Sequence, residues 1–313
     1  MAGAVRTSDA QTKGELAVIV AVASGKGGTG KTTIAVSLAL SVAAGAILPR
    51  QADEDAPAVM LLDCDVEEPN AHLFLRPEIR LSCEMGIPTP VVDESRCSRC
   101  RRCAEVCAYH ALAVIGERVL VFAELCHGCG SCAWNCPEGA IHEELRPTGL
   151  VEVGRAGALG FAHGILNVGE PMPGPVIRQV KKEGAAIAPG GLVVVDAPPG
   201  TSCPVVESLR GADYALLVTE PTPFGLHDLR MAVDVARGEL GLPVGVVVNR
   251  VGVGDDGVDE YCRAEGIPVL LRVPLDRRIA EACSEGVPLP QALPEYRQVF
   301  RDLYRRICRE VDG

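Results

Sequence analysis

The sequence predicts an α/β protein built on a doubly wound, mostly parallel β-sheet. Apolar, β-branched runs recur along its 313 residues and alternate with helical stretches. Strands that are apolar throughout are typical of a parallel sheet with helices on both faces, because both sides of each strand are buried. The expected strands are residues 16–23, 59–63, 191–199, 214–221 and 244–250, and the expected helices are residues 34–46, 175–184, 227–240 and 256–265.

The composition favours a globular protein with an acidic surface. Hydrophobic residues make up 48% of the chain and the mean hydropathy is +0.20, so the chain can bury a full core. The net charge of -11 argues against general binding to nucleic acid, which requires a basic surface. We therefore expect no nucleic-acid partner.

The sequence also predicts a cytoplasmic protein. Residues 1–15 are polar and lack the apolar core and cleavage site of a secretory signal. Apolar runs such as residues 16–23 are too short to span a bilayer.

Eight of the 14 cysteines form two runs with the spacing CxxCxxCxxxC. Such tight spacing favours metal thiolates in a reducing compartment over disulfides. Three closely spaced cysteines with a fourth further along, repeated twice, favour two iron–sulfur clusters over a structural zinc site, whose cysteine pairs need a longer spacer. The runs are Cys97, Cys100, Cys103 and Cys107, and Cys126, Cys129, Cys132 and Cys136.

These runs resemble those of the bacterial two-cluster ferredoxins. Pro137 follows the last cysteine, while Ala108 stands where the first run usually carries proline. The resemblance implies that the fourth cysteine of each run ligates the other cluster. One 4Fe–4S cluster would take Cys97, Cys100, Cys103 and Cys136, and the other would take Cys126, Cys129, Cys132 and Cys107.

The cysteine runs lie in a segment that breaks the strand–helix alternation. Helical periodicity is lost from residue 91 to residue 145 and then resumes. We expect a small inserted α+β, ferredoxin-like domain at 91–145, dividing the larger domain into 1–90 and 146–313. Tyr109 and Trp134 are expected to pack its core. Four arginines form either a solvated basic face or a docking patch for an acidic electron carrier: Arg96, Arg99, Arg101 and Arg102.

A glycine-rich stretch separates the first expected strand from the first expected helix. Backbone N–H groups of such a loop can wrap phosphate oxygens at a helix N-terminus. The motif places Lys31 on the β- and γ-phosphates and the Thr32 hydroxyl on Mg²⁺, so ATP or ADP with Mg²⁺ is the expected ligand. The candidate nucleotide-binding residues are Gly25, Lys26, Gly27, Gly28, Thr29, Gly30, Lys31, Thr32 and Thr33.

The extra lysine, Lys26, makes this loop resemble the deviant Walker A motif of the MinD, ParA, Mrp and nitrogenase iron-protein superfamily. The resemblance extends to residues 63–70 (DCDVEEPN), which look like the first switch, and to residues 196–201 (DAPPGT), which look like the second. It implies that Lys26 reaches the nucleotide of a partner subunit. The protein would then act as a homodimer or as a heterodimer with a paralogous ATPase.

The same resemblance assigns roles to polar residues at the ends of expected strands. Asp65 would orient the attacking water, Asp63 would act near the magnesium waters, and Asp196 would be the Walker B acid. Ligands of open α/β sheets bind at these carboxyl ends. Asn249 and Arg250 match the position that contacts adenine. The expected catalytic residues are Lys26, Lys31, Asp65 and Asp196.

As a whole, the chain resembles MinD-superfamily ATPases that carry an inserted ferredoxin domain. The resemblance implies a nucleotide-gated dimer that couples ATP hydrolysis to electron transfer through two clusters to a redox partner protein. Two alternatives remain open. One is an Mrp-like carrier or assembly ATPase with clusters as cargo, and the other is a ParA- or MinD-like regulatory ATPase whose clusters sense redox state.

Cys203 and the C-terminal segment each suggest a further function that we do not favour. Cys203 follows the Walker B acid at the offset of a bridging-cluster ligand in the nitrogenase iron protein, but one such cysteine favours a small buried thiol. Residues 296–311 form an amphipathic helix like the membrane helix of MinD proteins. A helix that closes over the sheet explains the same apolar stripe, so membrane is not an expected partner.

Overall fold

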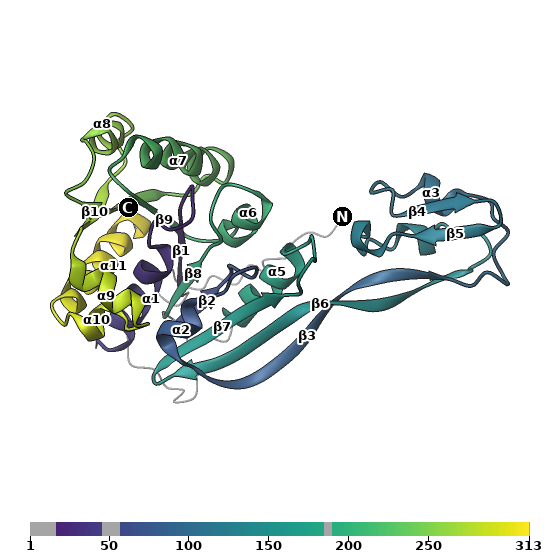
Figure 1. The fold of residues 1–313 in the computed structure, drawn as a ribbon, viewed down its shortest axis with the longest axis horizontal. Helices are drawn as coiled ribbons and strands as arrows, with labels where there is room; N and C mark the ends of the chain where they lie inside the picture. The colour runs from purple at the N-terminus through teal and green to yellow at the C-terminus, as the bar shows by residue number, and fades with distance from the viewer. Residues whose placement is uncertain (1–16, 46–56, 185–189, 313) are drawn as a thin grey trace.

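The computed structural model describes residues 17–45, 57–184 and 190–312. The polar stretch 1–15 lies outside them, as do residue 16 of the first expected strand and residue 46 of the first expected helix. A nine-stranded sheet carries helices on both faces (Figure 1), which confirms the predicted α/β class. The strands in sheet order are β11 (Val269–Pro274), β10 (Val244–Val251), β9 (Tyr214–Thr219), β1 (Val18–Ala23), β8 (Leu192–Asp196), β2 (Val59–Asp63), β7 (Leu159–Leu166), β6 (Ile141–Ala156) and β3 (Glu78–Val92).

The sheet is parallel from β11 to β7, and only β6 runs antiparallel to its two neighbours. β2, β8 and β9 are buried along their whole length, as expected of strands covered on both faces. All five expected strands are present. β3, β6, β7 and β11 were not predicted. β3 and β6 have long exposed stretches and lack a continuous apolar run, glycine and histidine interrupt the apolar run of β7, and Arg272 interrupts that of β11.

Helices cover the two faces in two groups, each with its own apolar core. α11 packs against α1, and Phe300 and Ile307 are fully buried there, which confirms that the C-terminal stripe closes over the sheet. Among the described residues, no helix has the length and apolarity needed to cross a bilayer. One group comprises α1 (Lys31–Ala43), α2 (Ala71–Leu75), α9 (Arg277–Ser284), α10 (Leu289–Ala292) and α11 (Tyr296–Asp312), and the other comprises α5 (Gly174–Glu183), α6 (Cys203–Leu209), α7 (Pro223–Val233), the π-helical η3 (Asp234–Glu239) and α8 (Gly257–Ala264).

β3 and β6 extend beyond the sheet as a long two-stranded ribbon (Figure 1). Their pairing runs from Glu78 opposite Arg155 to Val92 opposite Ile141. The ribbon therefore begins earlier and ends later in the sequence than the 91–145 boundary. At its far end lies a unit that we call the cysteine lobe, residues 93–140. Its elements are α3 (Arg102–Glu105), β4 (Leu112–Ile115), β5 (Arg118–Val121), η1 (Ala123–Leu125) and α4 (Ser131–Trp134).

The interior of the cysteine lobe is made of sulfur and small aliphatic side chains. Its buried members are Cys103, Cys107, Ala111, Leu112, Cys126, Cys132 and Ala140. The prediction that Trp134 and Tyr109 pack this core is wrong, because they are 92% and 44% exposed. The short helix α4 directs Trp134 outward, and Tyr109 instead stacks on His127 with ring centroids 3.5 Å apart.

Leucine-to-alanine substitutions test this division between core and ribbon. Leu216 in β9 is fully buried, whereas Leu145 on the ribbon is 73% exposed. Leu216→Ala should lower the free energy of unfolding by about 2–5 kcal/mol, because it leaves a cavity in the core. Leu145→Ala removes the same atoms at the surface and should change it by less than about 0.5 kcal/mol. Urea unfolding followed by circular dichroism measures both, and equal losses would contradict the assignment.

Candidate functional site

The loop between β1 and α1 adopts a conformation that requires glycine. Gly28 and Gly30 have φ angles of 77° and 92°, in the left-handed region that other residues rarely adopt. A Cβ atom on Gly25 would lie 2.1 Å from the backbone carbonyl oxygen of Asp228. One on Gly30 would lie 2.6 Å from the side-chain nitrogen (Nδ2) of Asn249. The neighbouring elements therefore pack directly on the loop backbone.

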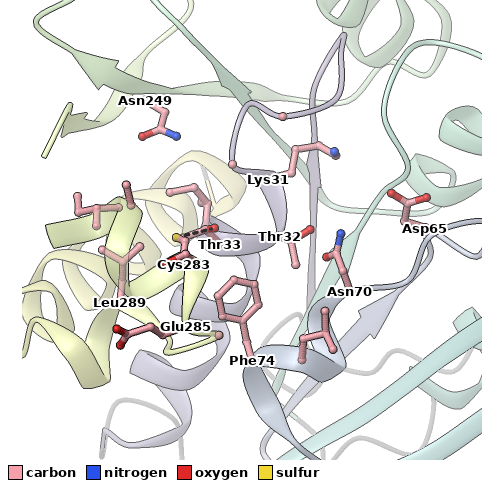
Figure 2. Close-up of a pocket in the computed structure, with 18 of the residues that line it drawn as sticks. Lys31, Thr32, Thr33, Asp65, Asn70, Phe74, Asn249, Cys283, Glu285 and Leu289 are labelled. Carbon is pink, nitrogen blue, oxygen red and sulfur yellow. Dashed lines mark hydrogen bonds between the residues drawn. The ribbon is translucent and has the colours of Figure 1, made fainter. Parts of the chain in front are cut away.

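The loop opens into a cavity of about 1080 Å³ at the carboxyl edge of the sheet. Figure 2 shows Lys31 and Thr32 on the same side of this cavity as Asp65 and Asn70, with Asn249 across from them. Lys26, Gly25, Thr29, Asp63 and Asp196 lie outside the lining. The predicted site residues that line the cavity are Gly27, Gly28, Gly30, Lys31, Thr32, Thr33, Asp65, Asn249 and Arg250.

Asp63, at the end of β2, shapes the segment that follows it. Its buried carboxylate accepts backbone hydrogen bonds from Asp65 at 3.1 Å and from Asn70 and Ala71 at 3.0 Å. We call residues 63–70 the switch segment. Burial and the neighbouring Asp196 raise the pKa of Asp63. In this structure, therefore, Asp63 holds the switch segment against the start of α2.

Asp196, the cross-strand neighbour of Asp63, is buried without a full set of hydrogen-bond partners. Neither of its carboxylate oxygens has a hydrogen-bond partner of normal geometry among the described residues, although the Thr32 side chain is close enough to lower its pKa. Burial raises its pKa, and the charge of Lys31 opposes the rise. A buried carboxylate needs a charged or hydrogen-bonding partner. The residues present therefore fit a hydrated Mg²⁺ ion, which Thr32 and Asp196 would hold.

Asp65 is the cavity carboxylate best placed for proton chemistry. It is partly buried, and this burial raises its pKa to about 6, against the opposing charge of Lys31. A carboxylate with a pKa near neutrality can orient a water molecule and accept its proton. The switch segment thus presents a carboxylate on the Lys31 side of the cavity.

The two cysteine runs converge on two separate cavities in the lobe. Each cavity is lined by three cysteines of one run and the fourth cysteine of the other. One holds Cys97, Cys100, Cys103 and Cys136, and the other holds Cys126, Cys129, Cys132 and Cys107. Within the described ranges, no three His, Cys, Asp or Glu side chains approach closely enough to hold a single metal ion.

The two runs also repeat one backbone conformation. Left-handed φ angles occur two and four residues after the first cysteine of each run, and three residues after its last. The equivalent pairs are Arg99 (58°) and Gly128 (62°), Arg101 (66°) and Gly130 (72°), and His110 (53°) and Gly139 (55°).

The last cysteine of each run accepts an equivalent backbone hydrogen bond. The N–H of Ala111 donates to Sγ of Cys107 at 3.2 Å, and the N–H of Ala140 donates to Sγ of Cys136 at 3.3 Å. Hydrogen bonds to sulfur stabilise thiolates and iron–sulfur clusters. The two loops are therefore alike in shape and in the way they present sulfur, although the first uses arginine and histidine where the second uses glycine.

Comparison with known proteins assigns the chain to a family. The family described as the CobQ/CobB/MinD/ParA nucleotide binding domain matches residues 20–289. The protein MJ0579 of Methanocaldococcus jannaschii is 31% identical over 277 residues, which are 86% of this chain and 90% of that protein. The chain belongs to the CobQ/CobB/MinD/ParA family.

Two further known proteins are similar to this chain. A Synechocystis protein named as an iron-sulfur cluster carrier is 25% identical over 308 residues, 92% of this chain and 68% of that protein. The septum site-determining protein MinD of Pyrococcus horikoshii, solved with Mg-ADP, has a similar fold. Its TM-score is 0.52 at 18% identity, and the match covers 93% of this chain and 96% of the MinD chain. Membership in this family of P-loop ATPases implies ATP hydrolysis.

In this MinD/ParA-family chain, Glu220, the residue after β9, connects the loop to β10, a role that sequence reasoning missed. Glu220 pairs with Arg250 and lies 3.3 Å from Nζ of Lys26. Arg250 donates to the carbonyl of Gly28 at 3.1 Å, and Asn249 donates to that of Thr29 at 2.8 Å. The TEPTPFGLHDL phrase beginning at residue 219 was the available signal.

The expectation that Cys203 is a small buried thiol is wrong. Cys203 is exposed, because it is the first residue of α6 and lies outside the apolar face of that helix. Cys64 and Cys262 are the buried thiols outside the lobe, and burial raises the pKa of both.

Replacing Asp196 should raise the stability of the fold and lower the ATPase activity. Without nucleotide, Asp196→Asn should raise the free energy of unfolding by roughly 1–3 kcal/mol at alkaline pH, because a neutral amide needs less compensation when buried. The folded-state pKa is raised, so the gain should shrink as acidification protonates the native carboxyl. ATP hydrolysis should fall roughly a hundredfold.

Thermal unfolding across pH and a phosphate-release assay measure these changes. Asp302→Asn, at an exposed position on α11, is the matched control and should alter neither. An Asp196→Asn protein less stable than the wild type without nucleotide would contradict the account.

Proposed function

We propose that the protein is a nucleotide-gated iron–sulfur ATPase, in which ATP turnover in a dimer controls electron transfer through two 4Fe–4S clusters to a redox partner protein. The observation that carries the proposal is the pair of lobe cavities, each lined by four cysteines grouped as in two-cluster ferredoxins. They occur on the same chain as a P-loop ATPase site.

The lobe suits two clusters as resident groups. Bound 4Fe–4S clusters supply one-electron transfer. Four of the proposed ligands are buried in the lobe interior: Cys103, Cys107, Cys126 and Cys132. The backbone donors Ala111 and Ala140 favour the thiolate form that ligation requires. These features support a ferredoxin-like domain inserted between two parts of the ATPase domain.

The nucleotide site supplies the controlling reaction. Lys31 would bind the β- and γ-phosphates, the Thr32 hydroxyl would ligate Mg²⁺, and Asp65 would orient the attacking water. Asn249 and Arg250 border the cavity where adenine would lie. Lys26 would leave Glu220 and reach the nucleotide of the second subunit, in a homodimer or a heterodimer with a paralogous ATPase.

The chain connects the two sites directly. α2 follows the switch segment, and only Arg76 and Pro77 separate α2 from the first residue of β3. β3 then runs to the cysteine lobe, and β6 returns from it to pair with β7. A rearrangement of the switch segment on nucleotide binding would therefore act on a strand that ends at the proposed cluster ligands.

Similarity to a named iron–sulfur cluster carrier supports a second candidate, in which the clusters are cargo. Outside the lobe, however, the cysteines are isolated: Cys64, Cys83, Cys203, Cys262, Cys283 and Cys308. Clusters with buried ligands should transfer slowly to an apo-acceptor. Rapid transfer of labelled cluster to such an acceptor would favour the carrier function.

Serine substitutions test how the cysteines are grouped. The anaerobically reconstituted wild type should hold about eight iron atoms per chain. Cys97→Ser and Cys136→Ser should each lose about four, and the double variant should lose no more, because both residues serve one cluster. The pair Cys97→Ser and Cys107→Ser should lose about eight.

Iron counting and EPR of the dithionite-reduced proteins provide the measurement. Cys203→Ser, at an exposed cysteine outside the lobe, is the matched control and should lose no iron. Complete loss of iron in the Cys97→Ser, Cys136→Ser double variant, or zinc in place of iron in the wild type, would overturn the grouping.

A further inference from the structure

A row of polar side chains crosses the sheet from the nucleotide site to the ribbon. Asp196 on β8 pairs in register with Asp63 on β2, Asp63 pairs with His163 on β7, and His163 pairs with Glu152 on β6. Residues in direct register on neighbouring strands point to the same face of the sheet. These four ionisable residues therefore form one line on the face covered by α1 and α2.

His163 is the member of this row that contacts both sides. Its side chain is 4% exposed, and its Nε2 lies 2.9 Å from Oε2 of Glu152. Its ring meets the ring of His72 edge-on, with centroids 5.3 Å apart. His72 belongs to α2, which begins where Asp63 holds the switch segment. His163 thus lies between the switch segment and the ribbon strand β6, and both His163 and Glu152 also line the cavity into which the loop opens.

A backbone path runs parallel to this row. The N–H of Leu166 on β7 donates to the carbonyl of Val66 in the switch segment at 2.8 Å. The next residue, Asn167, donates to the carbonyl of Thr148 on β6 at 2.9 Å. The Thr148 hydroxyl lies 3.4 Å from the carbonyl of Met85 on β3. Both ribbon strands are therefore connected through β7 to the segment that carries Asp65.

The ribbon changes register just past these contacts. The β3–β6 pairing shifts between Met85 and Gly86, and a Cβ on Gly86 would lie 3.0 Å from the carbonyl oxygen of Arg146. Beyond this point β6 has no further pairing with β7. Such irregularities bend strands and increase their twist. Glu152 lies on the sheet side of this irregularity and the cysteine lobe lies on its other side. A displacement of β6 at Glu152 would therefore reach the lobe through the irregularity.

We propose that His163 and Glu152 are positioning residues that transmit the nucleotide-dependent arrangement of the switch segment to β6, and along the ribbon to the cysteine lobe. The inference rests on the proposed nucleotide gating. It adds a route through β7, separate from the direct chain connection between α2 and β3.

Hydrogen–deuterium exchange of the full-length protein tests this route. Wild type, Glu152→Ala and Glu152→Gln are compared with ADP and with a non-hydrolysable ATP analogue, both at saturation. The informative segments are residues 86–92 and 141–147 of the ribbon, and residues 24–34 report nucleotide occupancy. Glu144→Ala is the matched control, because it removes an exposed His–Glu contact, to His142, from the same strand.

The wild type and Glu144→Ala should show a difference in ribbon exchange between the two nucleotides. Glu152→Ala should lose that difference while residues 24–34 stay protected. Glu152→Gln can still form a hydrogen bond with His163 and should therefore retain the difference. A nucleotide-dependent difference that persists in Glu152→Ala would overturn the route and leave the gating proposal standing. No difference in the wild type would overturn the gating proposal itself. Loss of protection at residues 24–34 in Glu152→Ala would assign Glu152 to nucleotide binding and also overturn the route.

Discussion

The antiparallel pairing of β3 with β6 is the constraint on which the rest of the structure depends. At one end β3 and β6 are the last two strands of the nine-stranded sheet, and at the other their pairing holds the two ends of the cysteine lobe together. A two-stranded ribbon alone is only marginally stable, so its order derives from β7 on one side and from the lobe on the other. Loss of the pairing would separate the ATPase site from the cysteines.

Both sites concentrate groups that need a cationic partner. Asp63 and Asp196 stand side by side in the buried part of the sheet, and the oxygens of Asp196 have no hydrogen-bond partner of normal geometry among the described residues. In the lobe, four of the side chains in the buried cluster are cysteines. Each site is therefore folded in a form that a metal-containing ligand would stabilise, which couples binding to local order.

Local spacing explains what could be predicted from the sequence. The loop at residues 25–33 and the two cysteine runs are recognisable from neighbouring residues, and the five strands with continuous apolar runs were found. The grouping of cysteines across the two runs came instead from the resemblance to two-cluster ferredoxins. The exposed strands β3 and β6 have no such run, so the ribbon was missed. The contacts of Glu220 and the exposure of Cys203 and Trp134 depend on tertiary packing. The row through His163 depends on strand register, which the sequence does not display.

The central claim, that nucleotide controls the clusters, is tested most directly by their redox potentials. Midpoint potentials of the reconstituted protein should be measured by EPR-monitored titration with ADP and with a non-hydrolysable ATP analogue. The account predicts a nucleotide-dependent shift on the order of 59 mV, a tenfold change for one electron, that disappears in Lys31→Ala. Identical potentials and identical EPR spectra in both nucleotide states of the wild type would contradict it.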